Sequence, residues 1–329
     1  MFVTYASART VCAVTSTLLG PASSDVDSAP GLPIVKWVGG KHRLLESILA
    51  NYTGQTRVVE PFLGGGALSI ALSAQYPDLE VYANDKIAEL IEIYRAVAGD
   101  VEGFITAVEA YAAPYLACPD KASRRAHYYE IREAYMSRTI DGPVPLFFLL
   151  WCAYSGMYRT GMKYPGRFNT PHGFGKEKAG FYHPTRLRLD APLIAKWHLS
   201  TVDFADLGQY VTPDTFVYLD PPYRETYSGY TASGFSEIDQ LRVVEFAHLA
   251  DAKGATFVYS NKYQDDGFYE NNFHGFDIRF IDVRHQVNHN AATVGRPKVA
   301  EVLITNHRAD PASVTSLASS TILDMREAS

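Results

Sequence analysis

The chain has 329 residues, of which 47% are hydrophobic and 20% are charged, and its formal net charge is −6. These proportions are typical of a globular protein and exclude disorder along the whole chain. No run of about 18 uncharged apolar residues occurs, so a membrane-spanning helix is not expected. The three cysteines, Cys12, Cys118 and Cys152, are too few and too widely spaced for a disulfide framework or a metal cluster. We therefore expect a cytoplasmic protein.

The two ends of the chain differ in composition from its middle. Residues 1–32 contain a weakly apolar run behind Arg9 that faintly resembles a secretory signal, but Thr and Ser interrupt it. Residues 308–329 are rich in Ser, Ala and Thr. We expect a flexible leader at 1–32 and a flexible tail at 308–329.

The apolar pattern predicts strands that alternate with helices, which is typical of a doubly wound α/β sheet. In chain order we expect a helix at Lys41–Tyr52, strands at Arg57–Pro61 and Glu80–Ala83, a helix at Lys86–Ala98, a strand at Thr215–Leu219, a helix at Ile238–Ala252, a strand at Ala255–Tyr259, and an antiparallel pair at Phe276–Val283 and Val299–Thr305. The last pair predicts a mixed sheet.

Residues 99–200 interrupt this alternation and read as an inserted module. They contain an amphipathic helix around Ser123–Met136, an aromatic run at Phe147–Tyr158, and a Gly, Pro and basic stretch from Gly156 to Gly180. Residues 101–200 hold 13 Lys and Arg against 8 Asp and Glu, a balance of +5, whereas the rest of the chain has a balance of −11. Because phosphate binding depends on the local field, a basic middle in an acidic chain is compatible with DNA.

A glycine-rich segment, Glu60–Ala67, reads EPFLGGGA between a predicted strand and a helix. Glycines allow a tight turn and a close approach of the backbone to a ligand. Asp85 follows the next strand about 20 residues on, where a carboxylate can accept hydrogen bonds from ribose hydroxyls. A plain strand-to-helix turn, with Asp85 as a helix N-cap, is the alternative.

The segment Asp220–Tyr223 reads DPPY at the end of another predicted strand. The Asp220 carboxylate and the Pro221 carbonyl can both accept hydrogens from one exocyclic NH₂ group, and Tyr223 offers a ring on which a flipped base can stack. A proline-terminated loop without chemical meaning is the alternative. A third segment, Lys36–Lys41, reads KWVGGK before a helix, where Lys41 either pairs with a carboxylate or is a surface lysine.

Together these segments resemble the Dam-type (D12 class) DNA adenine-N6 methyltransferases, in which KWxGGK, EPFxGGGA, a strand-end ND and DPPY occur in this order. The resemblance runs from about Pro33 to His307. It implies a Rossmann-like methyltransferase fold with a mixed sheet and an inserted, mainly helical target-recognition domain at 99–200, between catalytic segments at 33–98 and 201–307. It implies a site-specific enzyme that moves a methyl group from S-adenosylmethionine to N6 of adenine in duplex DNA after base flipping.

The resemblance also implies roles for individual residues, with no metal among them. S-adenosylmethionine would contact Trp37, Lys41, Phe62, Gly64, Gly66, Asp85, Asp203, Phe204 and Asp220. The catalytic residues would be Asp220, Pro221, Pro222 and Tyr223. DNA would contact Ser155, Arg159, Lys163, Arg167 and Asn169.

Two departures from the family pattern lie in the segment that should read DNA. Family members commonly have Asn-Gly-Leu-aromatic-Arg where Ser155–Arg159 reads SGMYR, and Phe-Asn-Val-Pro-Phe-Gly where Phe168–Gly173 reads FNTPHG. The target sequence of relatives is therefore not transferred to this chain.

Other functions remain open from sequence alone. Methylation of cytosine N4 or of adenine in RNA uses similar chemistry, and a non-catalytic DNA-binding subunit could keep the cofactor fold. A dinucleotide oxidoreductase would leave Asp220–Tyr223 without a role. We expect duplex DNA as the partner and a monomer or weak dimer, and leave open a cognate endonuclease in a restriction-modification system.

Overall fold

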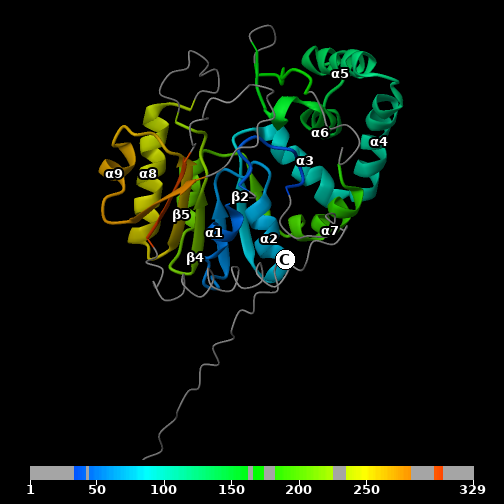
Figure 1. The fold of residues 1–329 in the computed structure, drawn as a ribbon. Coiled ribbons are helices and arrows are strands. Elements are labelled where there is room, and N and C mark those ends of the chain that lie inside the picture. Colours follow the sequence, from blue (N-terminus) through cyan, green and yellow to red (C-terminus); the bar gives the residue numbers. More distant parts are fainter. Residues whose placement is uncertain are drawn as a thin grey trace, which may run out of the picture.

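The computed structural model describes residues 33–41, 44–161, 166–173, 182–224, 235–282 and 300–306. In this part of the chain a seven-stranded sheet carries helices on both faces, and a group of helices stands beside it (Figure 1). The expected leader at 1–32 and tail at 308–329 lie outside the described residues. No helix of the described chain is long and apolar enough to cross a bilayer.

The secondary structure follows the predicted alternation. The elements are α1 (Leu45–Leu49), β1 (Arg57–Glu60), α2 (Ala67–Gln75), β2 (Glu80–Asn84), α3 (Ala88–Gly99), α4 (Val101–Ala117), α5 (Lys121–Met136), α6 (Pro143–Cys152), η2 (Tyr154–Gly156), α7 (Pro184–Ile194), β3 (His198–Ser200), η3 (Phe204–Tyr210), β4 (Thr215–Leu219), α8 (Glu237–Ala252), β5 (Thr256–Lys262), α9 (Phe268–Asn272), β6 (Asp277–Asp282) and β7 (Ala300–Thr305).

The strand order is β3-β2-β1-β4-β5-β7-β6. Strands β3 to β5 are parallel, whereas β7 runs antiparallel to both β5 and β6. The predicted α/β class with a mixed sheet is therefore confirmed. The winding of the chain reverses between β1 and β4, and open α/β sheets bind ligands beside the carboxyl ends of the strands at such a point.

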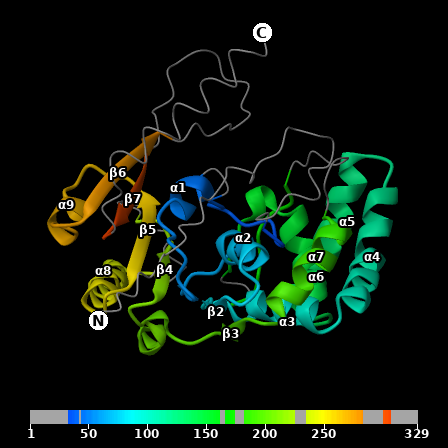
Figure 2. The same ribbon diagram turned by 90° about the horizontal axis from the view of Figure 1, so that it is seen from below.

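Alternate strand residues face opposite sides of the sheet, as the twofold period of a strand requires. On β4, Phe216 and Tyr218 join a hydrophobic cluster on one face, and Val217 and Leu219 join a second cluster on the other. Helices α1 and α2 lie over the first face, and α8 lies over the second (Figure 2). Because both faces are covered, β4 is buried along its whole length.

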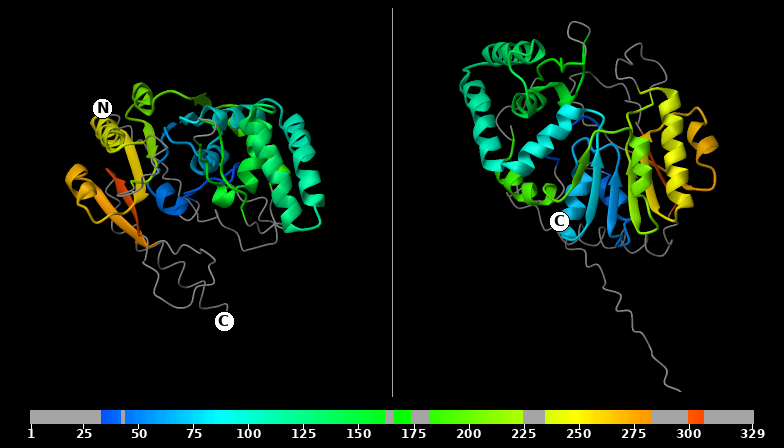
Figure 3. Two further views of the ribbon diagram at one scale, coloured as in Figure 1. Left: turned by 90° about the horizontal axis from the view of Figure 1, so that it is seen from above. Right: turned by 180° about the vertical axis from the view of Figure 1, so that it is seen from behind.

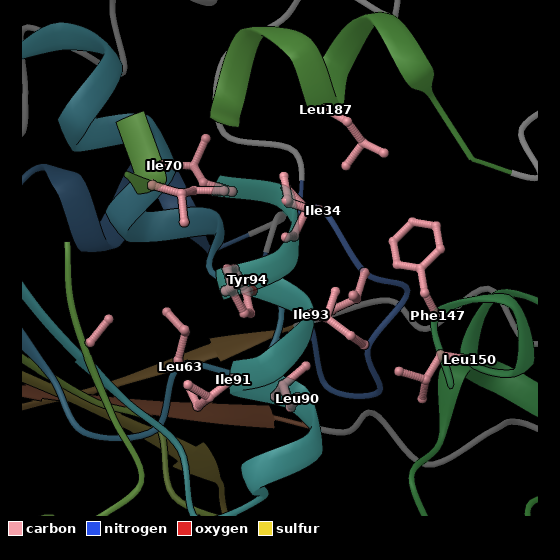
Figure 4. Packing of buried hydrophobic residues seen from close by; sticks show 14 of the residues in the cluster. Ile34, Leu63, Ile70, Leu90, Ile91, Ile93, Tyr94, Phe147, Leu150 and Leu187 are labelled. Carbon is pink, nitrogen blue, oxygen red and sulfur yellow. The ribbon is translucent and has the colours of Figure 1, made fainter. Parts of the chain in front are cut away.

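Helices α4 to α7 stand beside the sheet and continue its core. Helices α4, α6 and α7 pack on α3, and α5 packs on α4 and α6. Ile93 of α3 faces Phe147 and Leu150 of α6 and lies below Leu187 of α7 (Figure 4). Helix α6 is apolar all round and seven of its ten residues are buried, as expected for a helix at the centre of such a group. The helical group is therefore joined to the sheet by a shared core, and the two views in Figure 3 show it at one end of the sheet.

Three features differ from the sequence expectations. The predicted helix Lys41–Tyr52 is a short helix that begins at Leu45, so Lys41 precedes it. His198–Ser200, placed in the inserted module by the sequence, pairs with β2 as the edge strand of the sheet. Helices α4 and α7 were not predicted, and each contains a proline that weakens a helical pattern.

Candidate active site

The glycine-rich loop between β1 and α2 is held in a shape that needs glycine. Gly64 and Gly66 have φ of +48° and +69°, a region that other residues enter at a cost. A Cβ on Gly66 would lie 2.7 Å from the Tyr94 hydroxyl, which itself donates a hydrogen bond to the Gly64 carbonyl at 2.8 Å. A Cβ on Gly64 would lie 2.9 Å from Cδ1 of Trp37. The loop therefore brings the predicted residues Trp37, Gly64 and Gly66 together.

Asp85 joins the end of β2 to this loop. Its Oδ2 accepts the Gly64 N–H and its Oδ1 accepts the Ile87 N–H, both at 3.0 Å. Burial raises the pKa of Asp85 to about 6, and the two backbone hydrogen bonds only partly oppose this shift. Each oxygen keeps room for another hydrogen bond, because an ionised carboxylate has about four acceptor sites. Asp85 thus holds the glycine-rich loop by a hydrogen bond and can still accept hydrogen bonds from a ligand.

Asn84 ties the glycine-rich loop to the segment after β3. Its Nδ2 donates to the carbonyls of Pro61 at 3.1 Å and Val202 at 3.3 Å, and its Oδ1 accepts the Val202 N–H at 3.0 Å. The side chain is 1% exposed. Asn84 was not among the residues predicted for the site, although an amide side chain buried at a strand end must find hydrogen-bond partners and often bridges backbone groups.

This bridge places Asp203 and Phe204 beside the glycine-rich loop. The rings of Phe62 and Phe204 have centroids 5.1 Å apart, and Phe235 packs against both. Asp203 caps η3 through the Ala205 N–H and pairs with Arg242 at 2.5 Å. The Asp203 carboxylate is therefore bonded to groups of the protein. The three aromatic rings form an apolar surface beside the glycine-rich loop.

The second centre of the site is a group of four side chains, Lys41, Asp220, Tyr223 and Glu301, which we call the Lys41 cluster. The Lys41 ammonium lies 3.3 Å from Asp220 Oδ1, 3.0 Å from Glu301 Oε2 and 3.1 Å from the Tyr223 hydroxyl. The Tyr223 hydroxyl donates to Glu301 Oε1 at 2.8 Å. Lys41 is 8% exposed and Glu301 is 3% exposed. All three ammonium hydrogens of Lys41 thus have an acceptor within the protein.

Burial and charge shift the pKa values in this cluster in opposite directions. Burial raises the pKa of Asp220, and Glu301 repels its charged form further, while Lys41 lowers it. Burial alone would lower the pKa of Lys41, but Asp220 and Glu301 outweigh burial and raise it. Burial raises the pKa of Tyr223 to about 12. Near neutral pH, Lys41 is therefore charged and Tyr223 is a neutral hydroxyl.

The loop that follows β4 is anchored at Asp220, Pro222, Tyr223 and Arg224. Ser260 of β5 donates to Asp220 Oδ1 at 3.1 Å, and Gln240 of α8 donates to the Pro222 carbonyl at 2.7 Å. Arg224 is 8% exposed and pairs with Glu237 at 3.0 Å and Asp266 at 2.8 Å. Such anchoring fixes the direction of the Asp220 carboxylate.

Glu60, at the start of the glycine-rich loop, is a buried carboxyl behind the site. It accepts a short hydrogen bond from the Ser69 hydroxyl. Burial raises the pKa of Glu60 to about 8, and the Ser69 bond opposes this only in part. The side chain is 2% exposed. Glu60 is therefore neutral over most of the physiological range.

Residues 153–161 and 166–173 form a hairpin-like segment, here the 153–173 hairpin, with antiparallel bridges Ala153–His172 and Thr160–Phe168. Arg159 is exposed, and its Nε donates to Asn169 Oδ1 at 3.2 Å. Ser155 is exposed and has φ +54°. Lys163 lies outside the described residues.

Arg167 differs from the other DNA-contact candidates because it is only 7% exposed. Its guanidinium donates to the Tyr135 carbonyl at 2.8 Å and to Asp141 at 3.0 Å, and it stacks over the Tyr135 ring. This placement favours a role in supporting the hairpin from the end of α5.

The 153–173 hairpin docks on the loop that carries Trp37. The Val38 N–H donates to the Gly156 carbonyl at 3.2 Å, and the ring of Trp37 stacks with that of Tyr158 at 6.1 Å. A Cβ on Gly156 would lie 2.6 Å from the Lys36 carbonyl oxygen. The hairpin and the glycine-rich loop therefore share Trp37 as a common neighbour.

Comparison with known proteins identifies the family. D12 class N6 adenine-specific DNA methyltransferases match residues 37–287. The type II methyltransferase M.MjaIII of Methanocaldococcus jannaschii is 29% identical over 272 residues, which cover 78% of this chain and 92% of that protein. The retron Ec67 DNA adenine methylase of Escherichia coli is 26% identical, covering 82% of this chain and 90% of its own. The DNA adenine methylase of Haemophilus influenzae is 25% identical, covering 82% and 92%. Because the family match spans well over half of the chain, the chain belongs to the D12 class of N6-adenine-specific DNA methyltransferases.

Proposed function

We propose that methyl transfer to adenine N6 takes place at the Asp220–Tyr223 loop, with the target base flipped out of the duplex. This proposal rests on the way in which Asp220 is bonded within the protein. Among the described residues, Lys41 and Ser260 both contact Oδ1 of Asp220, which leaves Oδ2 as an acceptor. Gln240 donates a hydrogen bond to the Pro222 carbonyl. This bond restrains the loop next to the Pro221 carbonyl, which is the second proposed acceptor.

These two acceptors match the two hydrogens of the adenine amine. The N6 lone pair is delocalised into the ring, and acceptance of both hydrogens by Asp220 and the Pro221 carbonyl favours a more pyramidal nitrogen. The same acceptors stabilise the positive charge that develops on N6. N6 ends with one methyl group and one hydrogen, and its other hydrogen leaves as a proton. Tyr223 supplies the ring on which the flipped base stacks.

The residues around the glycine-rich loop fit S-adenosylmethionine. When bound, this cofactor supplies an electrophilic methyl group on a positively charged sulfur. Asp85 would accept from its ribose hydroxyls, because both carboxylate oxygens keep acceptor capacity. Phe62 and Phe204 offer apolar faces for its adenine ring, and Gly64 and Gly66 let the loop turn tightly against Trp37 and Tyr94. Trp37 and Asp203 also lie beside the glycine-rich loop.

The structure refines the proposed part of Lys41. Its ammonium is saturated by Asp220, Glu301 and Tyr223, so we propose that its main task is to hold the catalytic loop. A direct contact with the cofactor stays a prediction.

We propose that residues 99–197 act as the target-recognition domain, since β3 belongs to the sheet. Ser155 and Arg159 are exposed on the 153–173 hairpin, and with Lys163 and Asn169 they are the proposed DNA contacts. Arg167 would support them from behind. The hairpin rests on the Trp37 loop, so a duplex held there would lie next to the catalytic loop. Flipping the base costs roughly a few kcal/mol, which duplex contacts offset.

One further proposal rests on the relatives. M.MjaIII is a type II methyltransferase by name, so membership of a restriction-modification system, with a cognate endonuclease, is a reasonable setting for this chain. A monomer or weak dimer stays a prediction from the sequence.

The proposed chemistry is tested by removing the Asp220 carboxylate. Asp220→Ala should abolish transfer of tritiated methyl from S-adenosylmethionine to duplex DNA while the circular dichroism spectrum is unchanged. Asp214→Ala is the matched control, because Asp214 precedes β4 at the opposite edge of the sheet, where it binds Thr56. Near-wild-type turnover by Asp220→Ala would exclude the loop as the catalytic site. Identification of the product as N4-methylcytosine would exclude the proposed base.

A further inference from the structure

Glu301 enters the site from a strand that is far from the motifs in sequence. It is the second residue of β7 and pairs with Lys262 at the end of β5. Because β7 runs antiparallel to β5, its first residues lie at the sheet edge where the parallel strands end. The antiparallel strand thus delivers a buried carboxylate to the edge that carries Asp220.

Both oxygens of Glu301 are used, and they bind residues of two different motifs. Oε1 accepts from the Tyr223 hydroxyl at 2.8 Å, and Oε2 accepts from the Lys41 ammonium at 3.0 Å. The ammonium also lies over the Tyr223 ring, 4.6 Å from its centroid. One side chain therefore sets the position of the ring proposed to stack on the base and of the cation beside the proposed acceptor.

With Glu301, the Lys41 cluster contains more carboxylates than cations. Asp220 and Glu301 carry two negative charges against one positive charge on Lys41, and the ammonium lies between them at 3.3 and 3.0 Å. A buried carboxylate whose charge is not fully compensated destabilises the folded protein. We therefore expect such a group to have a function. The shared ammonium leaves Asp220 only partly neutralised, which suits a group that must accept hydrogens from an amine.

We propose that Glu301 is a positioning residue for methyl transfer, which holds the Lys41 ammonium and the Tyr223 hydroxyl so that one Asp220 oxygen stays available to the adenine amine. This inference rests on the proposed role of the Asp220–Tyr223 loop. Without the Glu301 charge, Lys41 has a single carboxylate partner and moves onto Asp220. Tyr223 at the same time loses a charged acceptor for its hydroxyl.

The test uses the full chain with Glu301→Gln, Tyr223→Phe and the double variant. We expect kcat with duplex DNA to fall about 10- to 100-fold in Glu301→Gln, while KM for DNA stays within about threefold because the variant keeps the recognition surface. The double variant should lose less than the product of the two single losses, because both break the same contact. Glu80→Gln removes a strand carboxylate paired with Arg57 at the other edge of the sheet, and its kcat should be unchanged.

A pH profile separates positioning from a general structural effect. Among the described residues, the groups that face Asp220 are Lys41 before α1, Glu60 at the end of β1, Tyr218 on β4, Tyr259 and Ser260 on β5, and Glu301 on β7, and Tyr223 of its own loop binds Lys41 and Glu301. Glu301 is the neighbour on β7 that raises the pKa of Asp220. The acid limb of kcat should therefore move to lower pH in Glu301→Gln, and should not move in Glu80→Gln.

The outcomes distinguish this inference from the proposed function. Wild-type kcat with an unmoved acid limb in Glu301→Gln, together with an inactive Asp220→Ala, overturns the role of Glu301 and leaves the proposed function standing. An active Asp220→Ala overturns the proposed function itself. If Glu301→Gln does not fold, Tyr223→Phe provides the test. This variant breaks the hydrogen bond between Tyr223 and Glu301 and keeps every buried charge. A wild-type kcat in Tyr223→Phe would overturn the inference.

Discussion

The indole of Trp37 lies so close to Gly64 that a Cβ at residue 64 would come within 2.9 Å of indole Cδ1. Gly64 also has φ +48°, where another residue is strained by roughly 1–2 kcal/mol. We predict that Gly64→Ala displaces Trp37 and weakens binding of S-adenosylhomocysteine, measured by calorimetry, by about tenfold or more. Gly54→Ala is the control, because Gly54 has φ +98° and no atom within 4 Å of the added Cβ. Equal affinity in the two variants would refute the role of the Trp37 contact.

The buried carboxyl of Glu60 should make stability depend on pH. Burial raises its pKa from 4.5 to about 8 in the folded state, so the folded state keeps a proton that the unfolded state releases. The free energy of unfolding therefore falls as pH rises between these two values. Glu60→Gln removes this dependence, and its stability relative to wild type should increase from pH 5 to pH 8 by an amount on the order of a few kcal/mol. Urea unfolding at several pH values measures it.

The exposed Glu92 of α3 offers the control for this prediction. Its side chain is 53% exposed and pairs with Arg95, so Glu92→Gln should follow the wild-type pH dependence. A Glu60→Gln curve parallel to that of the wild type would show that Glu60 keeps an ordinary pKa.

Arg159 and Arg167 should separate DNA binding from folding. Arg167→Ala removes a buried guanidinium bonded to Tyr135 and Asp141, and should lower the free energy of unfolding by roughly 2–4 kcal/mol. Arg159→Ala should change stability by less than about 0.5 kcal/mol, and should weaken duplex binding and reduce its salt slope by about 1. Urea titration and fluorescence anisotropy at several salt concentrations measure these effects. A stable Arg167→Ala that loses DNA affinity would instead place Arg167 on the DNA surface.

Arg224 should be needed to hold the end of the Asp220–Tyr223 loop. Its guanidinium binds Glu237 and Asp266 and stacks over Phe268 at 3.7 Å. Arg224→Ala should lower the free energy of unfolding by roughly 2–4 kcal/mol and reduce kcat, and Arg224→Lys should restore little, because an ammonium lacks the planar fork. Arg188→Ala, which breaks an exposed pair with Glu102, should leave the free energy of unfolding close to that of the wild type. Equal losses in Arg188→Ala and Arg224→Ala would contradict this account.

The strand-end residues were predictable from sequence because a parallel sheet gathers its carboxyl ends. Asp85 and Asp220 each follow a short apolar run, so their arrival at one edge follows from the strand pattern alone. The reach of Glu301 across to Lys41 was not predictable, since it depends on the antiparallel placement of β7 between β5 and β6. The strand pattern predicts β7 but does not indicate which of its ends meets the site.

Charge patterns likewise indicated a basic module but did not rank its arginines. Arg159 and Arg167 stand eight positions apart in the same Gly-rich and basic stretch, yet one is exposed and the other is covered by Tyr135. The difference arises from how α5 packs beside the hairpin, which is a tertiary contact. The short α1 has a similar cause: the Leu44 and Ile48 spacing predicts a helix, while Lys41 is drawn out of it into its three hydrogen bonds.

The bond between Lys41 and Glu301 joins residues 260 positions apart, and this has a consequence for synthesis on the ribosome. Glu301 is added 78 positions after Tyr223. A growing polypeptide therefore contains the whole Asp220–Tyr223 loop well before the strand that locks it in place. Chains that end before Glu301 would carry that loop without its lock, so we expect such chains to transfer methyl groups more slowly than the full chain.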